Sequence, residues 1–347
     1  MSKARLALIG AGWWGVEVYV PAMLASEEIE LVAVNRRNKD ALNQIVEKFD
    51  GVSGYTDYRE MLEKEELDGV VITSPHTVHF EHAKAALEAG CHVLIDKPMT
   101  TNADDARALV ELAAEKGLEI LIPYGWNYKE FATQASELIA RGKVGEVRHV
   151  TCNMATFTYD LFGGHGLSEA ADHMFQPNKS TWADPDNAGG YGWGQLSHAL
   201  GLMFRLVDLA PKEVYAIKTN SDANVDLTDA AVLTFENGAK ASISGSALVP
   251  KHCSYQMDVR VYGSEGMLLI DMERTRMELR RFDKEDLVLD LELDEGQYAA
   301  VEPITRLGEV CQGTAKTIEA NGTIGMRAIE VLDAMYRSFN SGQSEKV

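Results

Sequence analysis

The chain has 347 residues, of which 46% are hydrophobic, and its formal net charge is −20. This length predicts two domains with sizeable cores, and the negative charge argues against nucleic-acid and anionic-membrane partners, because phosphate contacts need a basic surface. No apolar run reaches the roughly 18 residues of a spanning helix, and the cysteines are widely spaced, as is usual in reduced compartments. We therefore expect a cytoplasmic protein.

The first motif is a glycine-rich turn between a predicted strand at 6–9 and a predicted helix, with the next strand at 31–34. In a βαβ unit such a turn lets backbone N–H groups approach a pyrophosphate at the start of the helix. A chance turn is the alternative. We expect dinucleotide contacts from Gly10, Gly12, Trp13, Trp14 and Gly15.

The second strand leads into Asn35, Arg36 and Arg37. An acidic residue at this place would bind the ribose hydroxyls of NAD, whereas an arginine can pair with a 2′-phosphate and stack on adenine. Two arginines at a strand end can also be ordinary solvated surface. We favour NADP(H) as the cofactor, bound in part by these three residues, with NAD as the alternative.

Strand and helix signals alternate through the first part of the chain. Strands are predicted at 69–73, 92–95 and 118–122, and helices at 39–49, 78–89 and 102–114, with a further helical link at 128–141. Asn102 is the expected N-cap of its helix. We therefore expect an α/β protein with an N-terminal Rossmann domain, a doubly wound parallel sheet, over residues 1–125.

After residue 146 the pattern changes to alternating strands and tight turns. Asn237-Gly238 between two strand runs is a strong hairpin signal, and alternating apolar residues at 257–261 predict a strand with one buried face. The weakly periodic segment 156–186 is expected to be functional, because long loops in compact domains usually are. We expect residues 126–347 to form an α+β domain with a large open, mostly antiparallel sheet, and the helix at about 324–341 to pack back on the first domain.

Asp96, Lys97 and Pro98 follow the predicted strand at 92–95. Ligands bind outside the carboxyl ends of such strands, so Lys97 is expected near the nicotinamide, held by a proline whose peptide bond can be cis. A partly desolvated ammonium beside a nicotinamide cation should have a lowered pKa, which suits proton transfer. A solvated lysine before a loop is the alternative.

His198 opens an apolar helical stretch after the glycine-rich segment 189–194. We expect it to face a cleft between the domains, where it could hold a substrate hydroxyl and exchange its proton near neutral pH. A structural histidine fits the pattern equally well.

The regular spacing of His76, His79 and His82 suggests a metal site. Three-residue steps drift around a helix, however, and no acidic or thiol ligand accompanies the histidines at a recognised spacing. We therefore expect no metal.

On these motifs the chain resembles the glucose–fructose oxidoreductase / inositol dehydrogenase / rhizopine-catabolism (Gfo/Idh/MocA) oxidoreductase family over essentially its full length. The resemblance implies that Lys97 and His198 serve catalysis. It also implies that the open sheet mediates contacts in a homodimer or homotetramer. The implied cofactor contacts come from Thr73, Ser74, Pro75, His76, His79, Asp96, Lys97 and Pro98.

One position departs from the family's pattern. Members commonly carry an aspartate four residues before the histidine, and this chain has Gly194 there, with Gln195 beside it. A missing carboxylate cannot anchor a hydroxyl, so Gln195 is expected to offer an amide contact instead. Other expected pocket residues are Tyr124, Trp126 and Asn127, although core packing explains the aromatics equally well, and the polar or aromatic loop residues His165, His173, Asn178 and Trp182.

Together these features predict an NADP-dependent oxidoreductase that transfers a hydride between the nicotinamide and a secondary hydroxyl or ketone of a sugar, cyclitol or sugar acid. Lys97 would relay the proton, and His198 would position or polarise the hydroxyl. One alternative is a cofactor-retaining enzyme that cleaves glycosides by transient oxidation and elimination, which turnover without added cofactor would reveal. The other is a non-catalytic ligand sensor, against which the retention of Lys97 and His198 argues.

Overall fold

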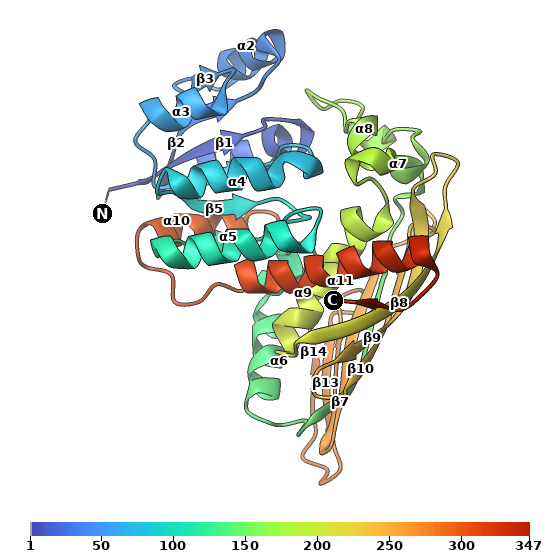
Figure 1. The fold of residues 1–347 in the computed structure, drawn as a ribbon. Coiled ribbons are helices and arrows are strands. Elements are labelled where there is room, and N and C mark those ends of the chain that lie inside the picture. Colours follow the sequence, from blue (N-terminus) through green and yellow to red (C-terminus); the bar gives the residue numbers. More distant parts are fainter. Residues whose placement is uncertain (1) are drawn as a thin grey trace. The chain divides into compact units, whose positions relative to one another are not determined.

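The structure, a computed structural model, describes residues 2–347 apart from the side chains of Asp290 and Leu293. The chain forms two compact units (Figure 1). Unit 1 comprises the chain up to Pro123 together with Gly166–Thr181 and Ala300–Met326, and unit 2 comprises Tyr124–His165, Trp182–Ala299 and Arg327–Val347. Two later segments, 166–181 and 300–326, therefore pack with the N-terminal part rather than with their neighbours in sequence.

Unit 1 is built on a parallel sheet of strand order β3-β2-β1-β4-β5-β6. The strands are β1 Ala4–Ile9, β2 Ile29–Asn35, β3 Ser53–Tyr55, β4 Gly69–Ile72, β5 His92–Ile95 and β6 Ile120–Leu121. The central strands are almost wholly buried, as expected for a parallel sheet covered on both faces. The order reverses between β1 and β4, and ligands bind at such a switch point, outside the carboxyl ends of the strands. The predicted Rossmann sheet is confirmed.

Side-chain caps start some of the helices of unit 1. The Asn102 side chain accepts the N–H of Asp105 at 2.8 Å, and the Asn38 side chain accepts the N–H of Ala41 at 2.9 Å. These contacts satisfy N–H groups that have no partner within the helix. The helices are α1 Val20–Ala25, α2 Lys39–Lys48, α3 Tyr58–Lys64, α4 His79–Glu88, α5 Ala103–Lys116 and α10 Glu302–Cys311, with a π-helical turn, Gly15–Tyr19, before α1.

Unit 2 contains a mixed sheet of strand order β14-β13-β12-β11-β7-β10-β9-β8-β15. Its neighbours pair antiparallel except β7 with β10, which are parallel in the described chain. The predicted Asn237-Gly238 turn joins β9 and β10, with Gly238 at a φ of 85°. The strands are β7 Val147–Ala155, β8 Pro211–Asn220, β9 Asp226–Phe235, β10 Lys240–Ser246, β11 Gln256–Gly263, β12 Gly266–Asp271, β13 Arg276–Arg281, β14 Leu287–Asp290 and β15 Glu345–Lys346.

One face of the unit 2 sheet is covered and the other is open. Helix α9, Ser197–Leu206, packs on β7 and β11, and α6, Glu130–Ala140, packs on β12. Along β8 the inward residues Val214 and Ala216 are buried, while Tyr215 and Ile217 between them are exposed. The predicted open, mostly antiparallel sheet is confirmed.

The remaining helices are α7 Tyr159–Gly163, α8 Lys179–Trp182 and the terminal α11 Gly322–Ser341. Helix α11 runs through the division between the units at Met326. In unit 1 a Cβ on Gly325 would lie 2.7 Å from Ile122, and in unit 2 Tyr336 stacks on Trp193 with ring centroids 4.7 Å apart. Over residues 2–347 no helix is both long enough and apolar enough to cross a membrane.

Candidate functional site

The glycine turn follows β1 directly. Gly10 has a φ of 81°, and a Cβ there would lie 2.5 Å from the Cα of Ser74, so the position needs glycine. The Asn35 carbonyl accepts the N–H groups of Gly10 and Ala11 at 3.1 and 2.9 Å. The buried Asn35 amide donates to the Tyr55 carbonyl at 3.1 Å. Asn35, predicted as a cofactor contact, therefore uses both its carbonyl and its side chain to hold the turn and β3 together.

The turn leaves space on the side where a pyrophosphate would bind. A Cβ on Gly15 would come within 2.5 Å of the Thr73 hydroxyl oxygen, and that hydroxyl donates to the Gly10 carbonyl at 3.0 Å. At Gly12, by contrast, an added Cβ would meet only the Gly10 carbonyl oxygen, at 3.5 Å, among the residues described. The open side at Gly12 and the start of the helix beyond it fit a dinucleotide.

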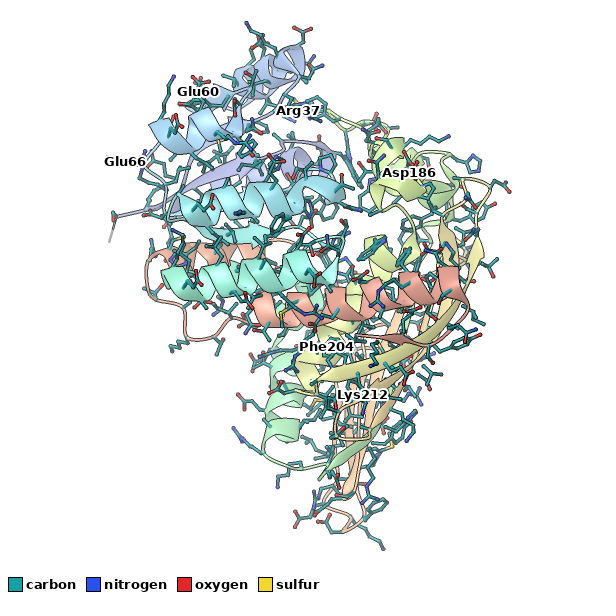
Figure 2. The ribbon with its side chains drawn as sticks, viewed as in Figure 1. Arg37, Glu60, Glu66, Asp186, Phe204 and Lys212 are labelled. Atoms are coloured by element: carbon teal, nitrogen blue, oxygen red, sulfur yellow. The ribbon has the colours of Figure 1, made fainter. Side chains whose placement is uncertain are left out.

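The two arginines predicted at the end of β2 differ in their contacts and in their exposure to solvent. The Arg36 guanidinium donates to the Ala11 carbonyl of the glycine turn and lies over the Phe175 ring, 3.8 Å from its centroid. Burial lowers the pKa of Arg36. Arg37 is exposed (Figure 2). Arg36 is therefore the residue that the structure brings to the glycine turn.

The lysine loop lies at the carboxyl end of β5. The Lys97–Pro98 peptide bond is cis, and the Asp96 side chain accepts the N–H of Lys97 at 2.9 Å. Burial lowers the pKa of Lys97, against the attraction of Asp96. Burial raises the pKa of Asp96, and Lys97, His79 and a hydrogen bond from Tyr19 oppose this change. The lowered pKa of Lys97 is the direction that proton transfer near neutral pH requires.

His79, in the first turn of α4, connects the loop after β4 with the lysine loop. Its Nδ1 lies 2.8 Å from the Pro98 carbonyl oxygen, and its Nε2 lies 2.7 Å from that of Ser74. Burial lowers the pKa of His79, and a neutral ring can donate only one of these two hydrogen bonds. The buried His76 ring packs against it, with centroids 6.0 Å apart. The loop residues predicted at 73–76 therefore adjoin the lysine loop.

The three regularly spaced histidines make separate contacts. The Ser74 hydroxyl lies 2.8 Å from Nδ1 of His82, and the Tyr58 ring packs on His82 with centroids 4.4 Å apart. Burial lowers the pKa of His82 to about 4. Both His79 nitrogens face carbonyl oxygens, which leaves neither free for a metal. Across residues 2–347, no group of three or more histidine, cysteine or acidic side chains is placed to hold a metal ion.

In unit 2, His198 lies in the first turn of α9 and is buried. The rings of Tyr124, Trp126 and Tyr298 pack edge-on against it, with centroids 5.9, 5.4 and 5.3 Å from that of the imidazole. The structure thus brings the predicted Tyr124, Trp126 and His198 together. Sequence reasoning missed Tyr298, because it lies far along the chain in a stretch with no periodic signal.

Backbone contacts hold this aromatic group in place. Trp126 Nε1–H donates to the Gly296 carbonyl at 3.0 Å, and the Asn127 amide donates to the Gly201 carbonyl at 3.1 Å. A Cβ on Gly201 would lie 2.2 Å from the Tyr124 ring, so α9 can approach Tyr124 only with glycine there. Asn127, predicted as a pocket residue, is fully buried and anchors α9.

Gly194, where the resemblance leads us to expect an aspartate, has no room for one. A Cβ there would lie 2.8 Å from Phe162 and 3.2 Å from Trp182. The aromatic side chains fill the space that a carboxylate would need. Gln195, beside it in the π-helical turn Gly192–Leu196, is half-buried.

The loop residues expected to line one ligand site fall in different units. His173 and Asn178 belong to unit 1, and His165 and Trp182 to unit 2. They make separate contacts: His165 with Tyr159, His173 with Trp13, Asn178 with the N–H of Ser180, and Trp182 with Phe162. The idea of a shared ligand site gains no support from these contacts.

Known proteins resemble the chain over both units. A family model for the GFO/IDH/MocA oxidoreductases, described as an NAD-binding Rossmann fold, matches residues 4–124, and a model for the GFO/IDH/MocA C-terminal domain matches residues 132–269. D-xylose 1-dehydrogenase (NADP(+)) 2 of Haloferax volcanii is 25% identical over 338 residues, which cover 96% of this chain and 97% of that protein.

Two further relatives are informative. D-glucoside 3-dehydrogenase of Escherichia coli is 31% identical over 183 residues, or 50% of this chain and 52% of that protein. The crystal structure of an inositol dehydrogenase homolog complexed with NAD+ from Azotobacter vinelandii matches with a TM-score of 0.80 at 21% identity, covering 100% of this chain and 98% of that one. The last likeness shows the fold.

Proposed function

Because the chain belongs to the GFO/IDH/MocA oxidoreductase family and carries its NAD(P)-binding Rossmann domain, we propose that it transfers a hydride between NADP(H) and a secondary hydroxyl or ketone of a sugar, cyclitol or sugar acid. The observation that carries this proposal is the position of Lys97 and the effect of burial on its pKa. Lys97 lies at the carboxyl end of β5, on the sheet edge to which the glycine turn also belongs, and burial lowers its pKa. Relatives named as dehydrogenases of xylose and of glucosides support the substrate class.

Lys97 is the residue that moves the proton. When the carbon of a secondary alcohol loses a hydride, its hydroxyl must lose a proton, and Nζ of a neutral lysine accepts it. Asp96, next in the chain, stabilises the ammonium that results. The bound nicotinamide supplies the acceptor or donor of the hydride.

In unit 2, His198 is the residue we propose to hydrogen-bond a substrate, and the aromatic rings around it fix the imidazole. Such rings also offer apolar surface to the C–H faces of a sugar. Near Gly194 the Phe162 and Trp182 rings occupy the space that a side chain would need. We therefore propose that no carboxylate at this position anchors the substrate.

A substrate screen tests the function. Polyols, aldoses and sugar acids would be offered with NADP⁺ and with NAD⁺, and reduction of the cofactor followed by nicotinamide absorbance. We expect reduction with at least one such compound. A protein that binds nucleotide but reduces it with none of them would contradict the proposed activity.

The cofactor preference leads to a first prediction. Arg36→Asp should erase or reverse a preference for NADPH over NADH, because a carboxylate repels the 2′-phosphate that a guanidinium binds. Charge-assisted contacts of this kind contribute roughly 1.5–3 kcal/mol, or about one to two decades in Kd. Titration of both nucleotides by fluorescence measures the effect. Arg148→Asp, at an exposed position on β7 in unit 2, is the control, and equal Kd values for the two nucleotides in the unchanged protein would refute the assignment.

We also propose that the open face of the unit 2 sheet joins copies of the chain. Ile217 on β8 and Val232 on the adjacent β9 are 57% and 52% exposed, and Tyr215 lies beside them. Clusters of exposed apolar side chains mark association surfaces.

A second prediction concerns the oligomeric state of the protein. Ile217→Lys should shift the molar mass in size-exclusion chromatography with light scattering towards the monomer, because a buried interface disfavours an unpaired charge. Phe282→Lys, which changes an exposed apolar residue after β13, should leave the molar mass unchanged. A monomeric unchanged protein, or an oligomer untouched by Ile217→Lys, would show that this face is not the interface.

A further inference from the structure

Segment 166–181 is one of the two parts of unit 1 that interrupt unit 2 in the sequence. Within unit 1 it lies against the residues of the candidate dinucleotide site. It contacts that site at two points, the start of the helix after the glycine turn and the end of β2. These are the two places at which a Rossmann domain holds the pyrophosphate and the adenosine ribose.

At the helix start, Trp13 Nε1–H donates to Nδ1 of His173 at 2.7 Å, and the two rings stack with centroids 6.2 Å apart. Because an indole nitrogen can only donate, Nδ1 of His173 must be the acceptor, and Nε2 of the neutral ring carries the proton. The N–H of Met174 donates to the Glu17 carboxylate at 2.8 Å. Segment 166–181 is thus fixed to the helix turn and offers an N–H donor from His173.

At the end of β2, the Phe175 ring covers one face of the Arg36 guanidinium. Met174 and Phe175 also pack against the apolar core of unit 1. A planar guanidinium held on a ring and bonded to the Ala11 carbonyl loses rotamer freedom. The N–H groups of the Arg36 guanidinium therefore point in one fixed direction before a phosphate binds.

Segment 166–181 could either fill the pyrophosphate site or lie along its edge, and the space beside Gly12 distinguishes these two roles. If the segment filled the pyrophosphate site, its atoms would crowd Gly12. Among the described residues, a Cβ there would meet only the Gly10 carbonyl oxygen. The contacts therefore border the phosphate space without occupying it.

We propose that residues 173–175 clamp the bound dinucleotide. His173 donates from Nε2 to the pyrophosphate, and Phe175 orients Arg36 for a 2′-phosphate, so the cofactor leaves only when the segment detaches from Trp13 and Arg36. This inference rests on the proposed NADP(H)-dependent function and adds to it one binding residue, His173, and one positioning residue, Phe175, both outside the glycine turn and β2.

The test measures release of NADPH and NADH by stopped-flow fluorescence, with excess NADP⁺ or NAD⁺ as the trap. Phe175→Ala should raise the release rate of NADPH by about tenfold, and that of NADH less, because only NADPH carries the phosphate that Arg36 binds. His173→Ala should raise both release rates to a similar extent. Lys179→Ala, which changes an exposed residue of the same segment, is the matched control and should change neither.

Phe175→Leu covers the case in which the alanine variant fails to fold, since leucine keeps the apolar packing and loses the flat ring. It should retain the faster release of NADPH. Release rates equal to those of the unchanged protein in the His173 and Phe175 variants would overturn the clamp, and so would tighter binding, which would mean that the segment competes with the cofactor. An unchanged protein that binds neither nucleotide would instead refute the proposed function.

Discussion

Lys97→Met is expected to lower turnover by roughly 10²–10⁴-fold, the usual contribution of a general acid–base group. Methionine keeps most of the length of the side chain and removes the amine that accepts the proton. NADPH affinity should change much less than turnover, since the glycine turn and Arg36 remain intact. Steady-state kinetics and a fluorescence titration of the same preparation separate the two effects.

The pH profile adds an independent readout. Because burial lowers the pKa of Lys97, the oxidation rate should rise with pH through a group that titrates below an ordinary lysine. This rise should vanish in Lys97→Met. Lys97→Arg is the matched control, because it keeps the positive charge but does not give up its proton in this pH range. An active variant of either kind with the original pH profile would show that another residue moves the proton.

Asp229→Asn is expected to stabilise the protein, by an amount that grows with pH. Asp229 is buried on β9, and burial, together with the adjacent Asp226 carboxyl, raises its pKa well above the ordinary value, while Lys218 opposes the shift. The folded state therefore keeps a proton that the unfolded state has already lost. Stability falls by about 1.4 kcal/mol for each pH unit between the unfolded and folded pKa values.

The measurement is the melting temperature of both proteins from pH 4 to pH 8. Asparagine does not titrate, so the variant should gain most at the upper end, and the difference should vanish near the ordinary carboxyl pKa. Asp226→Asn is the matched control. The Asp226 oxygens accept from Tyr336 and from the N–H of Gly192, both at 2.7 Å, and an amide can accept only one of these bonds. That variant should be destabilised, by about 1–3 kcal/mol. A melting difference for Asp229→Asn that does not depend on pH would contradict the assignment.

Local signals predicted the parts of the site that depend on local structure. The glycine turn could be read from the sequence because Gly10 and Gly15 sit where any Cβ would collide with Ser74 or Thr73. The position of Lys97 followed from the apolar strand before it. Asn102 acts as the expected cap because its side chain needs only an N–H three residues away.

Contacts between distant segments were beyond such reasoning. Nothing in the sequence around Phe175 indicates that it packs on Arg36, since the pairing depends on how a long loop returns to the first sheet. Tyr298 reaches His198 in the same way. The missing aspartate at Gly194 was visible in the sequence, but the rings of Phe162 and Trp182 that occupy the space beside it were visible only in the fold.

The position of helix α10 late in the chain determines when the core of unit 1 can be completed during synthesis. This helix packs on β1, β4 and β5, and its residues Ile304 and Leu307 belong to the same buried cluster as Leu6 and Leu8. During translation the N-terminal strands leave the ribosome long before residue 304 is added, so the apolar surface that α10 will cover stays open to water meanwhile. The core of the nucleotide-binding unit is therefore complete only after residues 302–311 have been synthesised, and nascent chains stalled before α10 should depend on chaperones.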